Sequence, residues 1–234
     1  MKNSKGYTAS VICIGICIFL QALPAYAHDN SGQTADTVTI LLTGFEPFAD
    51  FDCNPSQRIV THFHNTSRNN ASIIGLVLSV NFTSSVENVT YAVNQIDPDI
   101  IVSFGLAPGS RWVNIEQFAW NLKHDPEDPS PYFQQLQPDD KWVYRSTLPT
   151  RKIVTMLRSE EVPARMSWSA GTYICNAVFY NFLASSKVQD ADIMAGFVHV
   201  PPLDNQTDYG MSWSHLEEAV EIIIDTCLTS YENT

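Results

Sequence analysis

One cysteine of this sequence lies where the backbone could activate its thiol. Cys175 stands in the segment SAGTYICN (169–176), and the apolar residues after it recur at helical spacing. The pattern predicts a helix over 173–185, with Cys175 in its first turn and off the apolar face. The partial positive charge at a helix N-terminus favours the thiolate, which is the nucleophilic form. Cys175 is therefore a candidate nucleophile, and the alternative is a small buried cysteine that only packs.

A histidine and a carboxylate could serve that thiol. His199 ends the apolar run MAGFVHV (194–200), which predicts a strand. Ligands of open α/β sheets lie beyond the carboxyl ends of strands, so His199 could act as a base there; the alternative is a core histidine. Glu116 is an acid inside the apolar stretch NIEQFA (114–119). It could orient the histidine as the third member of a Cys–His–acid set, or it could lie at a solvated strand edge.

Several other chemistries lack a motif in the sequence. There is no GxGxxG, P-loop, GxSxG, HExxH or EF-hand pattern, and no Cys/His set at zinc-ligand spacing. His62 and His64 lie two residues apart on a predicted helix and do not share a face, so we predict no metal site there. The formal charge is −12, from 13 basic and 25 acidic residues. This balance argues against nucleic-acid binding and against a polybasic membrane patch.

The elements that would position these residues alternate along the chain. Strands are predicted over 37–43, 73–80, 99–104, 165–169 and 193–200, and helices over 55–65, 83–96, 151–160, 173–185 and 214–228. Such alternation favours a mainly parallel sheet with helices on both faces. The segment 123–141 is Pro-rich, acidic and aperiodic, and we interpret it as a surface excursion within one domain. The spacing of Ser214 and Glu217 predicts a capping box at the last helix.

The first 27 residues have the composition of a secretory leader. Lys2 and Lys5 precede the apolar run 11–20, and the sequence Ala25-Tyr26-Ala27 suits a processing site. We predict a signal peptide over 1–27 and a secreted or periplasmic domain over 28–234, with no membrane attachment after cleavage. An uncleaved anchor is the alternative, but the apolar run falls short of the roughly 20 residues that a span needs.

Three cysteines follow the predicted leader: Cys53, Cys175 and Cys227. Three is too few for a disulfide scaffold and an odd number for an oxidising compartment. Cys53 and Cys227 could pair if their Cα atoms lay within about 7 Å of each other. We favour three free thiols, because Cys227 falls in the apolar run IIIDTCL (222–228), where a small buried residue suits helix packing.

Six blocks of sequence resemble, in order, the pyroglutamyl-peptidase I family of cysteine peptidases, which remove an N-terminal pyroglutamyl residue from peptides. The blocks are TGFEPFADFDCNPS (43–56), PDIIVSFGLAPGSR (98–111), IEQFAWN (115–121), STLPTRKIV (146–154), VPARMSWSAGTYICNAVFYNFL (162–183) and AGFVHVPPL (195–203). The combination of SAGTYxCN with GFxHVP is highly specific, and the blocks cover nearly the whole chain after the leader.

The resemblance implies a site, a fold and a substrate class. Its catalytic triad falls on Glu116, Cys175 and His199, and Phe45 and Phe48 match the aromatic pair that flanks the pyroglutamyl ring. The fold implied is a single three-layer α/β/α domain around a mixed, mainly parallel sheet, often assembled as a homotetramer. The substrates implied are peptides with N-terminal pyroglutamate, and no metal or organic cofactor is implied.

Three departures from the family pattern leave other functions open. The family usually continues after IExxAxN with Ala-Arg-Ile-Pro-Asp-Asn, whereas this chain has LKHDPED (122–128). Pro202 stands where the family generally has an aromatic residue. The family is also mostly intracellular, whereas this chain carries a predicted leader. The alternatives are a secreted, catalytically impaired homologue that binds peptides, and a thiol amidase with a changed acyl pocket.

Overall fold

The computed structural model describes residues 37–233 apart from 50, 127, 130, 131, 186, 187 and 190–192, so the predicted signal peptide lies outside the described residues. The strands are β1 (Val38–Phe45), β2 (Thr66–Arg68), β3 (Ala71–Leu78), β4 (Ile100–Leu106), β5 (Val113–Glu116), β6 (Phe118–Trp120), β7 (Val143–Arg145), β8 (Ala164–Ser167) and β9 (Met194–Val200). The helices are α1 (Pro55–Phe63), α2 (Phe82–Ile96), α3 (Thr150–Ser159), α4 (Ile174–Ala184) and α6 (Trp213–Tyr231). None of these helices combines the length and the apolar character that crossing a bilayer requires.

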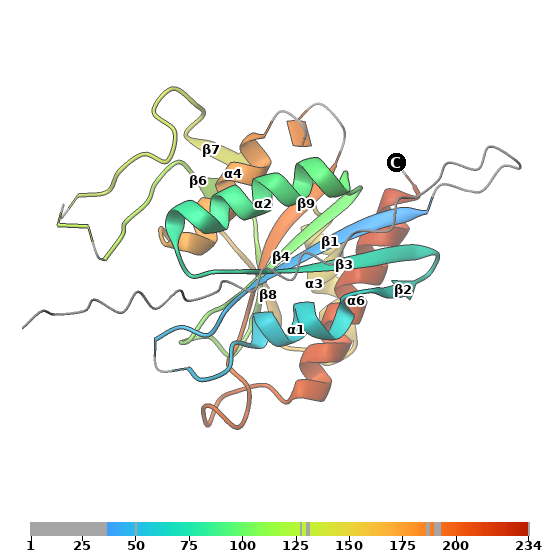
Figure 1. The fold of residues 1–234 in the computed structure, drawn as a ribbon. Helices are drawn as coiled ribbons and strands as arrows, with labels where there is room; N and C mark the ends of the chain where they lie inside the picture. Colours follow the sequence, from blue (N-terminus) through green and yellow to red (C-terminus); the bar gives the residue numbers. More distant parts are fainter. Residues whose placement is uncertain are drawn as a thin grey trace, which may run out of the picture. The chain divides into compact units, whose positions relative to one another are not determined.

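A mixed sheet with helices on both sides forms the centre (Figure 1). It has seven strands in the order β2-β3-β1-β4-β9-β5-β8. Strands β3, β1, β4 and β9 run parallel to one another, and β2 pairs antiparallel at one edge. Strand β5 pairs antiparallel with β9 and parallel with β8, so these two strands run opposite to the central four. The last strand in the sequence therefore lies between β4 and β5.

Helices cover both faces of the sheet because its strands are apolar on both sides. On β1, Ile40 and Leu42 face the core beneath α1, α3 and α6, whereas Leu41 faces the core beneath α2 and α4. Alternate residues of a strand point to opposite faces, so one strand serves both cores. The predicted three-layer α/β/α class with a mixed, mainly parallel sheet is confirmed.

The last helix begins earlier than its sequence suggests. Ser212 is the N-cap of α6, and its Oγ accepts a hydrogen bond from the backbone N–H of His215 at 3.3 Å. The capping box predicted at Ser214 and Glu217 is therefore wrong. Ser214 already belongs to α6, and its Oγ lies 3.1 Å from that of Ser212. Ser212 and Ser214 are both residue types that favour the N-cap position, so the sequence does not decide between them. The extended backbone of Ser212 identifies it as the N-cap.

The segment after β6 leaves the sheet and returns at β7, with which β6 forms a two-stranded antiparallel ribbon. Within this excursion, Asn121 Nδ2 donates a hydrogen bond to the carbonyl of Gln137 at 2.6 Å. Gln137 Nε2 then attaches the excursion to α4 by donating to Asn181 Oδ1 at 2.8 Å. Tyr180 of α4 also donates a hydrogen bond to the carbonyl of Lys141 at 2.6 Å. The predicted surface excursion is thus a long hairpin of the same domain, pinned to α4.

Candidate active site

Glu116 and His199 lie against each other on neighbouring antiparallel strands. Oε1 of Glu116 is 2.9 Å from Nδ1 of His199, and the side chains are 2% and 11% exposed. The register pairs His199 with Asn114, and Glu116 points to the same face two residues farther along β5. Glu116 is therefore buried and partnered, and the solvated strand edge considered from the sequence is wrong.

The second carboxylate oxygen of Glu116, Oε2, is buried and has no hydrogen-bond partner among the described residues. A buried carboxylate is unfavourable unless an opposite charge and hydrogen bonds compensate it. The His199 ring is its one ion-pair partner among the residues that the structure describes. The environment of Glu116 thus favours a positively charged His199.

Cys175 is the second residue of α4 and lies half-buried at the start of the helix. The N-cap residue Tyr173 gives no side-chain hydrogen bond to the first turn of α4. The first backbone N–H groups of a helix have no partner within the helix, so amide donors are available beside the thiol. Strand β8, which precedes α4, runs antiparallel to β9, and residues 168–173 lead the chain back to the thiol. The strand that precedes Cys175 in the sequence therefore does not run parallel to β9. The thiol reaches His199 through the connecting segment 168–173 instead of following a strand end directly.

Cys175 and Glu116 act together on the protonation of His199. Burial disfavours the charged ring, but the hydrogen bond and charge of Cys175, followed by those of Glu116, outweigh it and raise the pKa of His199 to about 10. Because Nδ1 faces Glu116, Nε2 is the ring nitrogen left for the thiol. The three residues named from the sequence are thus brought together. Their arrangement can present a sulfur nucleophile beside a proton donor.

Gly105 makes room for the thiol. It pairs with His199 in the β4–β9 register, and a Cβ added to it would lie 3.0 Å from Sγ of Cys175 and 2.9 Å from Cζ of Phe197. Contacts this short are not found for real Cβ atoms against a packed ring, so a side chain here would displace the sulfur or Phe197. In the sequence, Gly105 is marked only by its place after the predicted strand 99–104, which does not indicate contact with the thiol.

Asn176, which also escaped the sequence analysis, holds the thiol-bearing helix to the β5–β6 segment. Its Nδ2 donates to the carbonyls of Trp120 and Leu122, each at 2.8 Å, and its Oδ1 accepts from the backbone N–H of Trp120 at 2.9 Å. The side chain is completely buried. Because Asn176 follows Cys175 directly and Trp120 lies four residues after Glu116, this clamp fixes the thiol relative to the carboxylate.

An apolar pocket opens beside the thiol. Phe45, Phe48, Leu106 and Ile174 line it together with Cys175. Phe45 ends β1 and Phe48 lies in the loop after it. The end of β1 is fixed by Ser56, whose Oγ accepts a hydrogen bond from the backbone N–H of Phe45 at 3.0 Å and donates one to Asn54 Oδ1 at 2.8 Å. The structure therefore brings Phe45 and Phe48 to the same site as the thiol. Phe45 is buried and Phe48 is half-buried.

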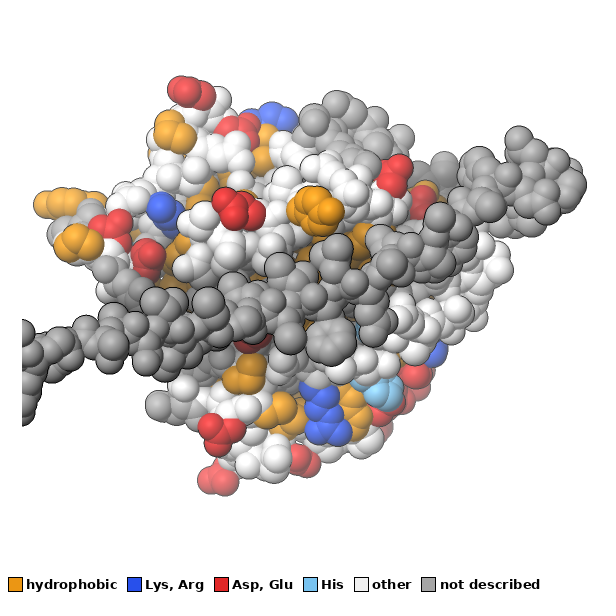
Figure 2. Space-filling model, viewed as in Figure 1, with side chains coloured by type: hydrophobic (Ala, Val, Ile, Leu, Met, Phe, Trp, Pro, Cys, Tyr) orange, Lys and Arg blue, Asp and Glu red, His pale blue; other side chains and the backbone are white. Residues whose placement is uncertain are grey.

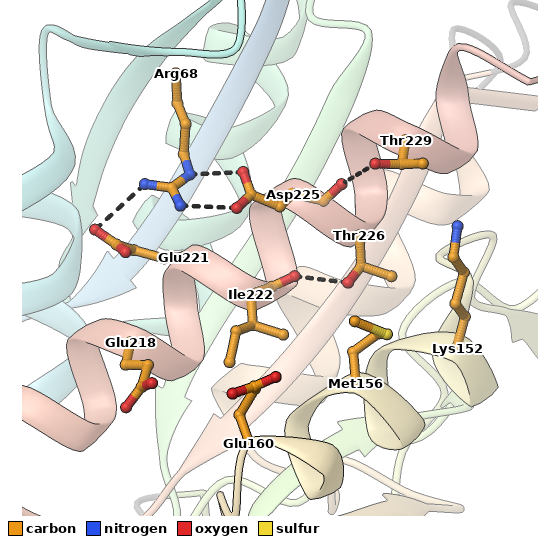
Figure 3. Close-up of a pocket in the computed structure, with 10 residues that line it drawn as sticks. All are labelled: Arg68, Lys152, Met156, Glu160, Glu218, Glu221, Ile222, Asp225, Thr226 and Thr229. Atoms are coloured by element: carbon orange, nitrogen blue, oxygen red, sulfur yellow. Dashed lines mark hydrogen bonds and ion pairs between the residues drawn. The ribbon is translucent and has the colours of Figure 1, made fainter.

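A separate charged hollow lies on the opposite face of the sheet, between α3 and α6, and its arginine is already paired (Figure 3). Arg68 forms an ion pair with Asp225 at 2.6 Å and with Glu221 at 3.3 Å. These contacts tie β2 to α6, so we assign a structural role to the ion pairs of Arg68.

Acidic side chains are scattered, without forming a single patch, on the face of the molecule shown in Figure 2.

The other cysteines and histidines named from the sequence lie apart from this site. Cys53 is exposed and Cys227 is fully buried in α6, and both are free thiols, as Cys175 is. Nε2 of His62 pairs with Glu217 at 2.8 Å, and Nδ1 of His64 accepts a hydrogen bond from the backbone of Gly75 at 3.0 Å. Each histidine thus has a partner of its own and does not turn toward the other.

Known proteins are similar to this chain in both sequence and fold. The sequence profile of the pyroglutamyl peptidase family matches residues 38–228. A pyrrolidone-carboxylate peptidase of Oceanobacillus iheyensis is 35% identical over 193 residues, which cover 79% of this chain and 96% of the relative. One of Thermococcus litoralis is 34% identical over 171 residues, which cover 71% of this chain and 78% of the relative.

Solved structures agree with this assignment. The pyrrolidone carboxyl peptidase of Thermococcus litoralis superposes with a TM-score of 0.79 at 31% identity, covering 84% of this chain and 96% of the other. The pyroglutamyl peptidase I of Bacillus amyloliquefaciens gives a TM-score of 0.75 at 29% identity, covering 81% and 96%. The shared sequence spans nearly all of the described sheet and helices, so this chain belongs to the pyroglutamyl peptidase family.

Proposed function

We propose that this protein is a cysteine exopeptidase that hydrolyses the bond after an N-terminal pyroglutamyl residue, with Cys175, His199 and Glu116 as its catalytic residues. The observation that carries the proposal is the position of His199, between a thiol at a helix start and a buried carboxylate 2.9 Å away. A structural histidine would not need both partners. The family assignment supports the substrate class.

In the first half of the reaction, the thiolate of Cys175 attacks the carbonyl carbon that joins pyroglutamate to the next residue. The electron pair of the C=O bond moves to oxygen, and backbone N–H groups at the start of α4 stabilise the resulting oxyanion. When the oxyanion collapses, the C–N bond breaks and Nε2–H of His199 gives its proton to the departing amine. A pyroglutamyl thioester on Cys175 and a free peptide result.

In the second half, neutral His199 takes a proton from a water molecule, whose oxygen attacks the thioester carbon. Collapse of this intermediate breaks the C–S bond, releases pyroglutamic acid and restores the thiolate beside a charged His199. Glu116 accepts the Nδ1–H hydrogen bond throughout, so it fixes the ring orientation and stabilises the charged form. No step calls for a group beyond water and these side chains.

The pocket of Phe45 and Phe48 suits the pyroglutamyl ring, which has no net charge and no free amine. The pocket is narrow, with a volume of about 20 Å³, which is room for roughly one water molecule. Phe48 is half-buried whereas Phe45 is buried, so we propose that the Phe48 side chain moves to admit the ring. We propose these two residues as the substrate-binding pair.

The experiment that tests the proposal is hydrolysis of pyroglutamyl-p-nitroanilide under reducing conditions, with alanyl- and prolyl-p-nitroanilide as controls. We expect turnover of the pyroglutamyl compound alone, and none after Cys175→Ala. Phe48→Ala should raise KM about tenfold, because it removes roughly 1.5 kcal/mol of apolar contact. Phe133→Ala, which removes an exposed ring outside this pocket, is the matched control and should leave KM unchanged.

Two alternatives give different results in the same assay. A catalytically impaired binding protein would bind pyroglutamyl peptides without releasing nitroaniline. A thiol amidase with another acyl preference would cleave one of the control amides and lose that activity with Cys175→Ala. Either result would contradict the proposed function.

We also propose that the protein acts outside the cytoplasm after cleavage near Ala27. The basic start, the apolar run 11–20 and the small residues at 25–27 support this proposal. N-terminal sequencing of the protein from its native source tests it. A mature chain that starts at His28 would agree with the proposal, whereas a retained Met1 would contradict it.

A further inference from the structure

A second hollow adjoins the catalytic histidine on the side away from the aromatic pocket. Its volume is about 340 Å³, and seven of its twelve lining residues have polar or charged side chains: Ser110, Asn114, Glu116, Arg165, Ser167, Ser169 and His199. The Glu116 carboxylate is engaged by His199, so the charge that remains to meet a ligand here is that of Arg165. The pocket beside Cys175 is apolar by contrast. The scissile bond must lie between the thiol and the imidazole, so the two hollows fit the two sides of that bond.

The register of the sheet fixes how far Arg165 lies from the catalytic histidine. Arg165 pairs with Asn114 across β8 and β5, and Asn114 pairs with His199 across β5 and β9. Paired residues point to the same face, and neighbouring strands lie about 4.8 Å apart. The Cα atoms of Arg165 and His199 are therefore about 10 Å apart by this spacing. An extended peptide advances about 3.3–3.6 Å per residue, so this Cα separation spans about three residues. Nε of Arg165 reaches Asn114, the register partner of His199, so the guanidinium itself lies closer and comes within one or two residues of the scissile bond.

The guanidinium of Arg165 is oriented but not neutralised. Its Nε donates to Asn114 Oδ1 at 2.6 Å, and Asn114 is itself buried and donates to Ser110 Oγ at 3.0 Å and to the carbonyl of Trp112 at 3.1 Å. No carboxylate among the described residues forms an ion pair with Arg165. The remaining N–H donors of the fork are therefore free, in a geometry that suits a carboxylate.

We propose that this hollow receives the peptide that leaves, and that Arg165 favours substrates with a carboxylate in the first residue released. The inference rests on the proposed function, because it assigns the other side of the bond that Cys175 cleaves. In a protein whose formal charge is −12, an acidic peptide is repelled by most of the surface. An unpaired arginine beside His199 supplies the local positive charge that offsets this repulsion.

The carboxylate can come from two sources with the same chemistry. It is either the side chain of Asp or Glu in the first released residue, or the terminal carboxylate of a pyroglutamyl dipeptide. Five substrates separate these sources: pGlu-Glu-amide, pGlu-Gln-amide, pGlu-Ala, pGlu-Ala-amide and pGlu-Lys-amide. The Glu/Gln pair isolates a side-chain carboxylate, and the Ala/Ala-amide pair isolates a terminal one.

The test is kcat/KM for all five substrates with the wild type and Arg165→Gln. We expect the wild type to prefer the carboxylate member of at least one pair about threefold to tenfold, and to cleave pGlu-Lys-amide least well. The preference should shrink at high salt, because salt screens the interaction of partly exposed charges. Arg165→Gln should bring the ratio close to one, and Arg165→Lys should keep part of it, since it retains the charge without the fork.

Arg111→Gln is the matched control, because Arg111 is an exposed arginine that lines a different hollow. It should keep the wild-type ratios. Ratios of one in the wild type, or ratios that Arg165→Gln leaves unchanged, would overturn the inference while pGlu-Ala-amide is still cleaved. Cleavage of none of the five substrates would instead count against the proposed function itself. If Arg165→Gln does not fold, the wild-type ratios and their salt dependence decide.

Discussion

Gly105 and Cys175 lie so close together that a side chain on the glycine would collide with the sulfur. A Cβ on Gly105 would lie 3.0 Å from Sγ, and the glycine is also the register partner of His199. The thiol therefore rests on bare backbone of the sheet, next to the imidazole. The sulfur is carried by the first turn of α4 and the ring by β9, and the two meet over the backbone of β4.

Gly105→Ala should lower kcat/KM about 10- to 100-fold and destabilise the fold by about 1–3 kcal/mol, because the added methyl must push aside Sγ or the buried Phe197 ring. Steady-state kinetics and urea unfolding measure the two effects. Gly109→Ala is the control for stability, since a Cβ there meets nothing within 4 Å. Wild-type kcat/KM and wild-type stability for Gly105→Ala would contradict this account of Gly105.

Cys175→Ala should lower the pKa of His199 from about 10. Cys175 raises this pKa more than Glu116 does. In the variant, only Glu116 would remain to offset the lowering of the pKa by burial. Titration of the His199 ring by NMR measures this shift without any need for activity. In the wild type, kcat/KM should fall as the pH rises through about 10, where the ring loses the proton that the leaving amine needs. An unchanged pKa of His199 in Cys175→Ala would contradict the conclusion that the thiol raises the pKa of the ring.

His199→Ala and Glu116→Gln should not have additive effects. We expect His199→Ala to be nearly as damaging as Cys175→Ala, and Glu116→Gln to cost about 10- to 100-fold, the equivalent of a hydrogen bond to a charged group. The double variant should resemble His199→Ala, because Glu116 acts through the ring. In Glu116→Gln, the fall of kcat/KM at alkaline pH should occur at a lower pH than in the wild type, because the carboxylate raises the pKa of His199. A double variant that multiplies the two single losses would argue against a shared role.

Asn176→Ala should both destabilise the protein and lower kcat. It leaves the backbone N–H of Trp120 and two carbonyls without their partner, a cost of about 1–3 kcal/mol for a buried group. Asn176→Asp keeps the acceptor for Trp120 but sets a carboxylate oxygen against those carbonyls, so it should be at least as damaging. Unfolding and kinetics measured together test the clamp. Wild-type behaviour of both variants would remove the positioning role.

The three thiols should differ sharply in reactivity. Cys53 is exposed and Cys175 half-buried, whereas Cys227 is fully buried, and burial raises its pKa to about 12. Alkylation of the native protein should therefore modify Cys53 and Cys175, and Cys227 only after unfolding. Mild oxidant should inactivate the enzyme reversibly, and Cys53→Ser should not prevent that loss. A Cys53–Cys227 cross-linked peptide in the non-reduced protein would contradict this prediction.

The fold class and the three clustered residues could be predicted because each has a local signature. Apolar runs marked the central strands, and the spacing after Cys175 marked the start of α4. The resemblance to the family then joined Cys175, His199 and Glu116. By contrast, β2, β6 and β7 have three residues each, too few for a period of two to be visible.

Long-range pairing explains what could not be predicted. Glu116 reads equally as a surface or a core residue until the antiparallel pairing of β5 with β9 sets its register. Asn176 and Gly105 look unremarkable in the sequence, because their partners are 56 and 70 positions away in the chain, at Trp120 and Cys175. Arg165 likewise gains its place beside the histidine only through two strand neighbours.

The position of β9 has a consequence for how the chain folds. Among the strands that the structure describes, β9 is synthesised after the other eight, yet it joins β4 to β5 in the middle of the sheet. Until it inserts, the nascent chain carries two partial sheets with open edges, which are sites for misassociation. Because β9 also carries His199, the thiol and the imidazole cannot come together until this strand has inserted. Such late, non-local pairing is slow, so the chain is most vulnerable to aggregation just before it becomes active.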